Sequence, residues 1–395
     1  MSGGMRSEML VSVRHCVVGW RLLLTATVAL LRLSSVHAED LPKVDTDATV
    51  QVPAFTLPPS EYWSPEFKAA YAKVVSAAIA RSRLDAKAKA ASASAYTQPA
   101  AGAPKAEWDE YDNHCDRQVA DVLAWEREHY PVELADTRIG GVKVSRVTPR
   151  AGVAAENRQR VLIQLRGASC GGLSLGQLEA IPVAFFGKIE VVVVDFRPAP
   201  RHPFPASIED VAAVYTGLMK QYTPDRIGVF GTSGGGILTA QFVAWCQATS
   251  LPRPGAIGIF WSGIPAWPYP FGKFGDSLLW EFGVPRSDHT QYDAMISKIA
   301  EYIHSAAPDD PRAYPMSSAT ALAKFPSTLF VTGGRALDMS AAVTSHARLL
   351  KLGVDSYLYV MEGAWHAASY GTLGSPEERD ANTYIGRWFG QHLAR

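Results

Sequence analysis

The sequence predicts an α/β fold in which a mostly parallel central sheet is flanked by helices and preceded by an N-terminal helical cap. From Thr137 onward, strand-like apolar runs alternate with helix-like runs, which is typical of a parallel sheet covered on both faces. Within residues 225–236, a glycine-rich turn joins a strand-like run to a helix-like run. The 395 residues are 47% hydrophobic, which is enough for a large core.

The start of the chain has the composition of an export signal. Arg6, Arg14 and Arg21 precede an apolar run over residues 22–31, and V-H-A at residues 36–38 resembles a small-residue cleavage site. A run this short does not span a bilayer comfortably. We therefore expect residues 1–38 to be a cleaved signal peptide, with a periplasmic or secreted product that is not stably inserted in a membrane. The alternative is an uncleaved membrane anchor.

Residues 39–135 are expected to form an N-terminal segment with the helical cap. Ser64 and Pro65 have the pattern of an N-cap and a first helical residue, for a helix that runs to about Leu84. Residues 86–106 are rich in Ala, Ser, Lys and Pro and are predicted to be a flexible linker. A second helix is expected over residues 107–130. Both helices precede the sheet, so they form either a cap over the site or a plain surface pair.

Residues 136–395 are expected to form the catalytic domain. We predict strands over residues 142–147, 160–165, 188–196, 227–230, 255–260, 328–332 and 356–361. The run at residues 188–196 contains four successive valines at 191–194, and we predict it as a fully buried central strand. Helices are predicted over residues 207–222, 237–245 and 383–393.

The glycine-rich turn has the pattern of a nucleophile elbow. G-T-S-G-G at residues 231–235 fits G-x-S-x-G, with a strand before it and a helix after it. Side chains at Gly231 and Gly235 would collide with the neighbouring strand and helix, while Ser233 is forced into a strained conformation. The helix N-terminus beneath the serine favours developing negative charge. We predict Ser233 as the nucleophile; the alternative is a glycine-rich turn without chemistry.

The predicted base is His366. A nucleophilic serine needs a base and an orienting acid, which follow the serine in the order acid, then His, on this kind of scaffold. His366 lies in E-G-A-W-H-A at residues 362–367, just past the last predicted strand. The other downstream histidines fit less well, because they lie in helical or linker segments or at the chain end: His289, His304, His346 and His392.

The segment after the strand that follows the elbow is dense in aromatic residues. Residues 261–286 contain Trp, Tyr, Phe and Pro with no regular period. Loops at the carboxyl ends of parallel strands face the ligand crevice. We therefore expect an aromatic wall for the apolar or aromatic part of a substrate, with a packed lid that does not contact substrate as the alternative. The predicted wall residues are Trp261, Trp267, Tyr269 and Phe271.

The chain resembles the bacterial hormone-sensitive-lipase-like carboxylesterases of the α/β-hydrolase superfamily. Residues 195–211, D-F-R-P-A-P-R-H-P-F-P-A-S-I-E-D-V, are similar to the family pattern D-Y-R-x-A-P-E-x-x-F-P-A-x-x-E-D. The resemblance extends from about Gly140 to the C-terminus. It implies the α/β-hydrolase fold, a small-molecule ester substrate, and neither cofactor nor metal.

The oxyanion motif departs from the family pattern. Where the family has H-G-G-G, residues 166–172 read R-G-A-S-C-G-G. The resemblance implies backbone donors at Ala168 and Ser169, with the amide of Gly234 as the third donor. Arg166 replaces a histidine and adds positive charge near the site. It would either clamp a substrate carboxylate or pair within the protein.

The acid departs from the pattern as well. The family has G-x-R-D or G-S-x-D after the penultimate strand, but residues 333–340 read G-G-R-A-L-D-M-S. Ala336 occupies the expected acid position, and Asp338 follows two residues later. Asp338 either orients His366 or caps a helix that starts near Ser340.

We therefore predict an exported serine hydrolase that cleaves carboxylic esters through an acyl-enzyme. The two departures keep open a catalytically reduced protein that binds a ligand, and fold alone does not separate esters from lactones, amides or polymer esters. A formal net charge of +0 and the lack of a basic patch argue against nucleic acid as a partner. Cys115, Cys170 and Cys246 would remain after signal removal; they allow one disulfide or none, and their spacing is not that of a metal site.

The signal-peptide prediction can be tested on the native protein. Cleavage after V-H-A should give a mature N-terminus at or near Glu39. Intact-mass measurement on protein from the cell envelope or medium checks this, and retention of residues 1–38 would contradict it.

Overall fold

The computed structural model describes residues 42–44, 46, 50–51, 56–82, 98–167, 172–267, 303 and 306–394. The predicted signal peptide and most of the predicted linker lie outside these residues. The chain divides into two compact units, Met1–Pro58 and Pro59–Arg395. In the first unit, β1 (Lys43–Val44) pairs antiparallel with β2 (Val50–Gln51).

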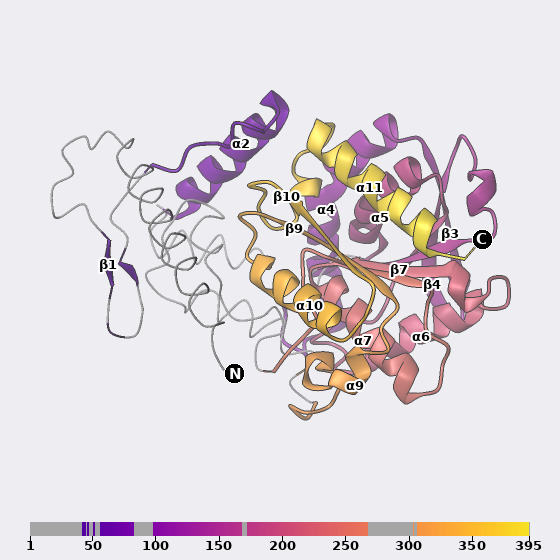
Figure 1. Cartoon of the computed structure of the whole chain (residues 1–395). Helices are drawn as coiled ribbons and strands as arrows, with labels where there is room; N and C mark the ends of the chain where they lie inside the picture. Colours follow the sequence, from indigo (N-terminus) through magenta and orange to yellow (C-terminus); the bar gives the residue numbers. More distant parts are fainter. Residues whose placement is uncertain are drawn as a thin grey trace, which may run out of the picture. The chain divides into compact units, whose positions relative to one another are not determined.

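The described part of the second unit is built around an eight-stranded sheet in the order β10-β9-β8-β7-β5-β6-β4-β3 (Figure 1). The strands from β5 to β10 run parallel, and β4 is antiparallel to both β6 and β3. This confirms the predicted mostly parallel sheet. The strands are β3 (Val132–Ile139), β4 (Val142–Pro149), β5 (Val161–Leu165), β6 (Val191–Val194), β7 (Ile227–Thr232), β8 (Ala256–Phe260), β9 (Ser327–Gly333) and β10 (Ser356–Met361).

Strand β3 was not predicted, because it is a largely exposed edge strand without an apolar run. The sequence feature that could have indicated β3 is the turn that follows it. Gly140 and Gly141 both have positive φ, 59° and 85°, and they join Ile139 to Val142 in a two-residue hairpin. Such hairpins favour glycine at both central positions.

Helices cover both faces of the sheet (Figure 1). Alternate residues of β6 point to opposite faces, so Val191 and Val193 pack in one core with α5 and α11, while Val192 and Val194 pack in another with α6, α7 and α10. The helices are α2 (Pro65–Ser82), α4 (Lys105–His129), α5 (Leu173–Gly187), α6 (Ala206–Leu218), α7 (Gly234–Ala248), α9 (Ala319–Leu322), α10 (Met339–Lys351) and α11 (Pro376–His392). Short 3-10 helices are η2 (Ala155–Asn157), η3 (Pro224–Arg226), η5 (Pro315–Ser317) and η6 (Ala368–Tyr370). Among the helices that the structure describes, none is both long and apolar enough to cross a membrane.

Helix α5 was also missed, since it contains two helix breakers. Gly176 lies against the sheet, where an added Cβ would come within 2.3 Å of Val193, and Pro182 lies inside the helix. Helix α11 begins at Pro376 rather than at Thr383, because Ser375 caps it by accepting a hydrogen bond from the Glu378 amide. The absence of a side chain at Gly176 lets α5 lie close to the sheet at Val193.

The two expected cap helices, α2 and α4, belong to the same compact unit as the sheet, Pro59–Arg395. Helix α4 ends on α5, where the Tyr130 ring stacks on Phe185 at 5.3 Å. Trp63, which precedes α2, donates from Nε1 to the Glu362 carbonyl at 2.7 Å. That carbonyl belongs to the loop that carries His366, so the segment before the sheet supports the loops of the site.

The turn after β7 provides a stability test. An added Cβ at Gly231 would lie 2.3 Å from the Gly235 carbonyl oxygen, and backbone cannot move aside as a flexible side chain can. We expect Gly231→Ala to destabilise the fold by about 1–3 kcal/mol, as overpacking does. Gly390→Ala is the control, because Gly390 lies in α11 with nothing within 4 Å of an added Cβ. It should leave stability unchanged or raise it by roughly 0.5–1 kcal/mol. Thermal unfolding of both variants checks this; equal melting temperatures would contradict it.

Candidate active site

Ser233 lies at a sharp turn between β7 and α7. Its φ of 55° and ψ of −117° are strained values for a residue with a side chain. Two backbone hydrogen bonds hold the turn: the Ser233 amide donates to Phe260 at 2.8 Å, and the Gly236 amide donates to the Ser233 carbonyl at 3.0 Å. An added Cβ at Gly235 would lie 1.9 Å from the Leu165 carbonyl oxygen. The local geometry is therefore that of a nucleophile elbow.

His366 lies between Ser233 and a buried carboxylate. It follows β10, and its Nε2 is 3.1 Å from the Ser233 Oγ while its Nδ1 is 2.6 Å from Asp338 Oδ1. An ionised carboxylate only accepts hydrogen bonds, so the Nδ1 proton is directed to Asp338. The free lone pair of Nε2 then faces the serine hydroxyl. This arrangement allows His366 to take a proton from Ser233.

Asp338 reaches His366 although it lies two residues past the position where the resemblance places the acid. Two successive turns, from the Ala336 amide to Gly333 and from the Met339 amide to Ala336, bring it back toward the sheet. Asp338 occupies the N-cap position of α10 but makes no side-chain capping bond. Its carboxylate is fully buried and accepts instead from His366 and from the Thr332 hydroxyl, the latter at 2.6 Å.

The structure describes part of the predicted oxyanion hole. Gly234 is the first residue of α7, where backbone amides are not used within the helix and point toward its N-terminus. Ala168 and Ser169 lie outside the described residues. Gly167, directly before them, packs against the elbow: an added Cβ would be 2.9 Å from the Thr232 carbonyl oxygen and 3.3 Å from the Ser233 Cβ. Gly167, the last described residue before the two other predicted donors, therefore lies beside Ser233.

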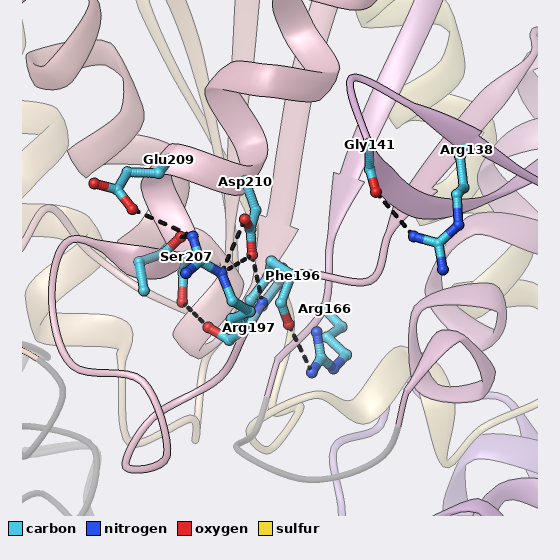
Figure 2. Close-up of polar contacts among 9 residues, drawn as sticks. Arg138, Gly141, Arg166, Phe196, Arg197, Ser207, Glu209 and Asp210 are labelled. Atoms are coloured by element: carbon cyan, nitrogen blue, oxygen red, sulfur yellow. Dashed lines mark hydrogen bonds and ion pairs between the residues drawn. The ribbon is translucent and has the colours of Figure 1, made fainter.

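Arg166 is buried in the protein. Its guanidinium lies over the Phe196 ring at 4.2 Å and donates to the Phe196 carbonyl at 3.5 Å (Figure 2). Burial lowers the pKa of Arg166, and this effect is opposed by the nearby charges of Asp195 and Asp112. Arg166 is only 2% exposed, so contact with a substrate carboxylate would require the side chain to leave this position. These surroundings are those of a cation that interacts within the protein.

Residues 195–211 match the family pattern. Hydrogen bonds and an ion pair join the loop at the start of this segment to the first turns of α6. Figure 2 shows Arg197, whose amide and Nε both contact the Asp210 carboxylate, at 2.8 Å for the amide. Ser207 donates to the Arg197 carbonyl at 2.6 Å. The Arg and the Glu-Asp pair of the motif therefore join the loop after β6 to the following helix.

Two of the four predicted wall residues are described. Trp261 directly follows β8 and is buried, with its ring edge-on to His366 at a centroid distance of 6.4 Å. Trp267 is 46% exposed and packs edge-on against Tyr314. Tyr269 and Phe271 lie outside the described residues. Of the described pair, Trp261 packs beside the base, whereas Trp267 has an exposed aromatic face.

Polar groups that the sequence analysis did not identify lie behind the elbow. Glu179 is buried within the apolar α5, and burial raises its pKa to about 8. Burial likewise raises the pKa of Glu126, which lies near Glu378 and Glu179. A carboxylate within an otherwise apolar helix was the available signal for Glu179, since such residues are rarely buried without a partner.

The two described cysteines differ in state. Cys115 is disulfide-bonded, whereas Cys246 is buried and free. The partner of Cys115 therefore lies outside the described residues. Among the residues that the structure describes, no group of His, Cys, Asp and Glu side chains could hold a metal ion.

Comparison with known proteins agrees with this geometry. Residues 183–369 match a family described as having the alpha/beta hydrolase fold. The chain is 30% identical over 147 residues to the protein named "Putative acetyl-hydrolase LipR" of Mycobacterium tuberculosis strain H37Rv, a match that covers 36% of this chain and 46% of that protein. The chain thus spans less than half the length of this curated relative.

Solved structures match over most of the chain. The esterase E25 has a TM-score of 0.68 and 27% identity over 87% of this chain and 99% of its own. An esterase from the bacterial hormone-sensitive lipase family has a TM-score of 0.63 and 20% identity over 84% of this chain and 99% of its own. The chain therefore has the α/β-hydrolase fold and is similar in structure to bacterial esterases, including one of the hormone-sensitive lipase family.

Proposed function

We propose that the chain is an exported serine hydrolase that cleaves carboxylic esters through an acyl-enzyme. The observation that carries the proposal is the continuous hydrogen-bonded series from Ser233 through His366 to Asp338 at a strained elbow. The similarity to esterases of known structure supports the same class of reaction.

The geometry supports a two-step reaction. The Ser233 Oγ attacks the ester carbonyl carbon while His366 Nε2 takes its proton. The resulting oxyanion is held by the Gly234 amide and by the donors predicted at Ala168 and Ser169. His366 then gives its proton to the leaving alcohol. In the second step His366 takes a proton from the water that attacks the acyl group, and it returns this proton to the Ser233 Oγ as the acid is released.

Asp338 has two effects in this reaction. Its contact with Nδ1 selects the imidazole tautomer that accepts the serine proton, and its charge stabilises the imidazolium that forms. The Thr332 hydroxyl occupies the other carboxylate oxygen and fixes the orientation of the acid. Both contacts are buried, so solvent does not compete with them.

Two observations bear on the substrate class. The exposed Trp267 suits an ester with an apolar or aromatic part, and the name of the curated relative favours a short acyl group such as acetyl. Lactones, amides and polymer esters are the alternatives. Export is proposed from the sequence of residues 1–38 and is supported by the disulfide at Cys115, because disulfides persist in oxidising compartments.

The nucleophile and base can be tested together. Ser233→Ala and His366→Ala should each lower kcat for p-nitrophenyl butyrate by roughly three or more decades, because each removes a group that acts as part of one unit. Ser233→Ala should also abolish labelling by a fluorophosphonate probe. His346→Ala is the matched control: this histidine lies on α10 and contacts Ser356. An unlabelled wild-type protein would instead favour the catalytically reduced, ligand-binding alternative.

The displaced acid has a separate test. Asp338→Asn should lower kcat by at least roughly two decades with little change in melting temperature, since the equivalent change in a serine protease costs about four decades. Asp355→Asn is the control. Asp355 lies just before β10 and accepts a hydrogen bond from Ser327 at the start of β9, whereas Asp338 and His366 follow the ends of these strands; the Asp355 side chain is half exposed. If Asp338→Asn were nearly silent in rate but lowered the melting temperature, the residue would serve α10 rather than His366.

A further inference from the structure

Glu179 lies behind the nucleophile and is not used in the mechanism above. It belongs to α5, whose other buried residues are apolar apart from Gly176, and it is 3% exposed. A buried carboxylate without hydrogen-bond donors would be strongly destabilising. The groups that contact the Glu179 side chain therefore indicate its role.

Groups from two parts of the chain, residues 164–167 and Thr232, meet the Glu179 carboxyl group. The Gly167 amide donates to Oε1 at 3.1 Å, and the Gln164 side-chain amide donates to Oε2. Burial raises the pKa of Glu179 and an interaction with the Thr232 side chain lowers it, so Thr232 also lies beside the carboxyl group. Thr232 Oγ1 also lies 2.6 Å from the Tyr370 hydroxyl, so the tyrosine is joined to the same group.

Each of these partners belongs to, or adjoins, a segment that carries catalytic groups. Gly167 directly precedes the predicted oxyanion donors, and Thr232 directly precedes Ser233. Tyr370 ends η6, four residues after His366. We infer that Glu179 is a positioning residue that holds Gly167, the elbow at Thr232 and Ser233, and the η6 turn after His366 in their mutual placement. This inference rests on the proposed function.

Gly167 shows how tightly the arrangement is packed. An added Cβ at Gly167 would be 3.3 Å from the Ser233 Cβ and 3.5 Å from Glu179 Oε1. The glycine thus lies close to both Ser233 and the Glu179 side chain. A shift of Glu179 would be transmitted directly to the start of the oxyanion segment.

A carboxyl group suits this position because its two oxygens can take part in several hydrogen bonds. Glutamine would keep one accepting oxygen but would place its NH2 group against the Gln164 amide or the Thr232 hydroxyl. The Gln164 Oε1 is buried without a hydrogen-bond partner in the described part of the chain. Among the described residues, the Gln164 side-chain amide is therefore held only by its hydrogen bond to Glu179. The other charged or titratable groups around Glu179 are Arg166, Glu126 and Tyr370.

The test compares Glu179→Gln with the exchange Gln164→Glu/Glu179→Gln. Misplacing catalytic groups by about 1 Å costs roughly 10²-fold, so Glu179→Gln should lower kcat for p-nitrophenyl butyrate by about 10- to 100-fold with KM changed by less than about threefold. The exchange restores an amide–carboxylate pair and should recover about tenfold or more. Glu126→Gln is the control, because Glu126 is also buried but its carboxylate makes no hydrogen bond among the described residues.

If Glu179→Gln does not fold, a second pair of variants tests the same inference. Thr232→Val removes the hydroxyl that joins Glu179 to Tyr370 and should lower kcat, whereas Thr232→Ser keeps the hydroxyl and should retain it. Fluorophosphonate labelling rates of Ser233 should follow kcat in both pairs.

Three results would overturn the inference. The first is an active wild type with Glu179→Gln and Thr232→Val within about twofold of its kcat. The second is a loss of rate that accompanies a loss of melting temperature and is not recovered by the exchange, which would indicate a merely structural residue. The third is a wild type that neither turns over esters nor labels, which would remove the proposed function and this inference with it.

Discussion

The structure depends on the close approach of backbone segments at the elbow. Ser233 keeps its strained backbone only because β5, β7 and α7 meet without side chains at Gly231 and Gly235. The sheet order places β5 and β7 side by side, so the loops that follow them lie against each other. The same order brings the loops after β9 and β10 together, and these carry Asp338 and His366. Four strand ends thus supply one site.

Buried carboxylates support this site from two directions. Asp338 approaches His366 from the loop after β9 and is held by Thr332. Glu179 approaches from α5 and accepts hydrogen bonds beneath the oxyanion segment and the elbow. Each is almost fully enclosed, which makes its hydrogen bonds strong and its removal costly. In this account, one carboxylate acts on the base directly, whereas the other acts through the placement of the backbone.

The sequence predicted those features that local patterns encode. Strand β10 was predicted with its observed bounds, and Ser233 and His366 were placed in the turns where the structure has them, because apolar runs end at each. Strand β3 was missed because an exposed edge strand has no apolar run, and α5 because Gly176 and Pro182 interrupt its pattern. The role of Glu179 could not be predicted, since its partners adjoin segments far apart in the chain.

The central claim is that Ser233 carries the acyl group during turnover. Rapid quenching of the reaction with p-nitrophenyl butyrate, followed by peptide mapping by mass spectrometry, tests it most directly. The account predicts a butyryl adduct on the peptide that contains Ser233 during steady-state turnover, and no adduct in His366→Ala. Turnover without an adduct, or an adduct on another residue, would contradict it.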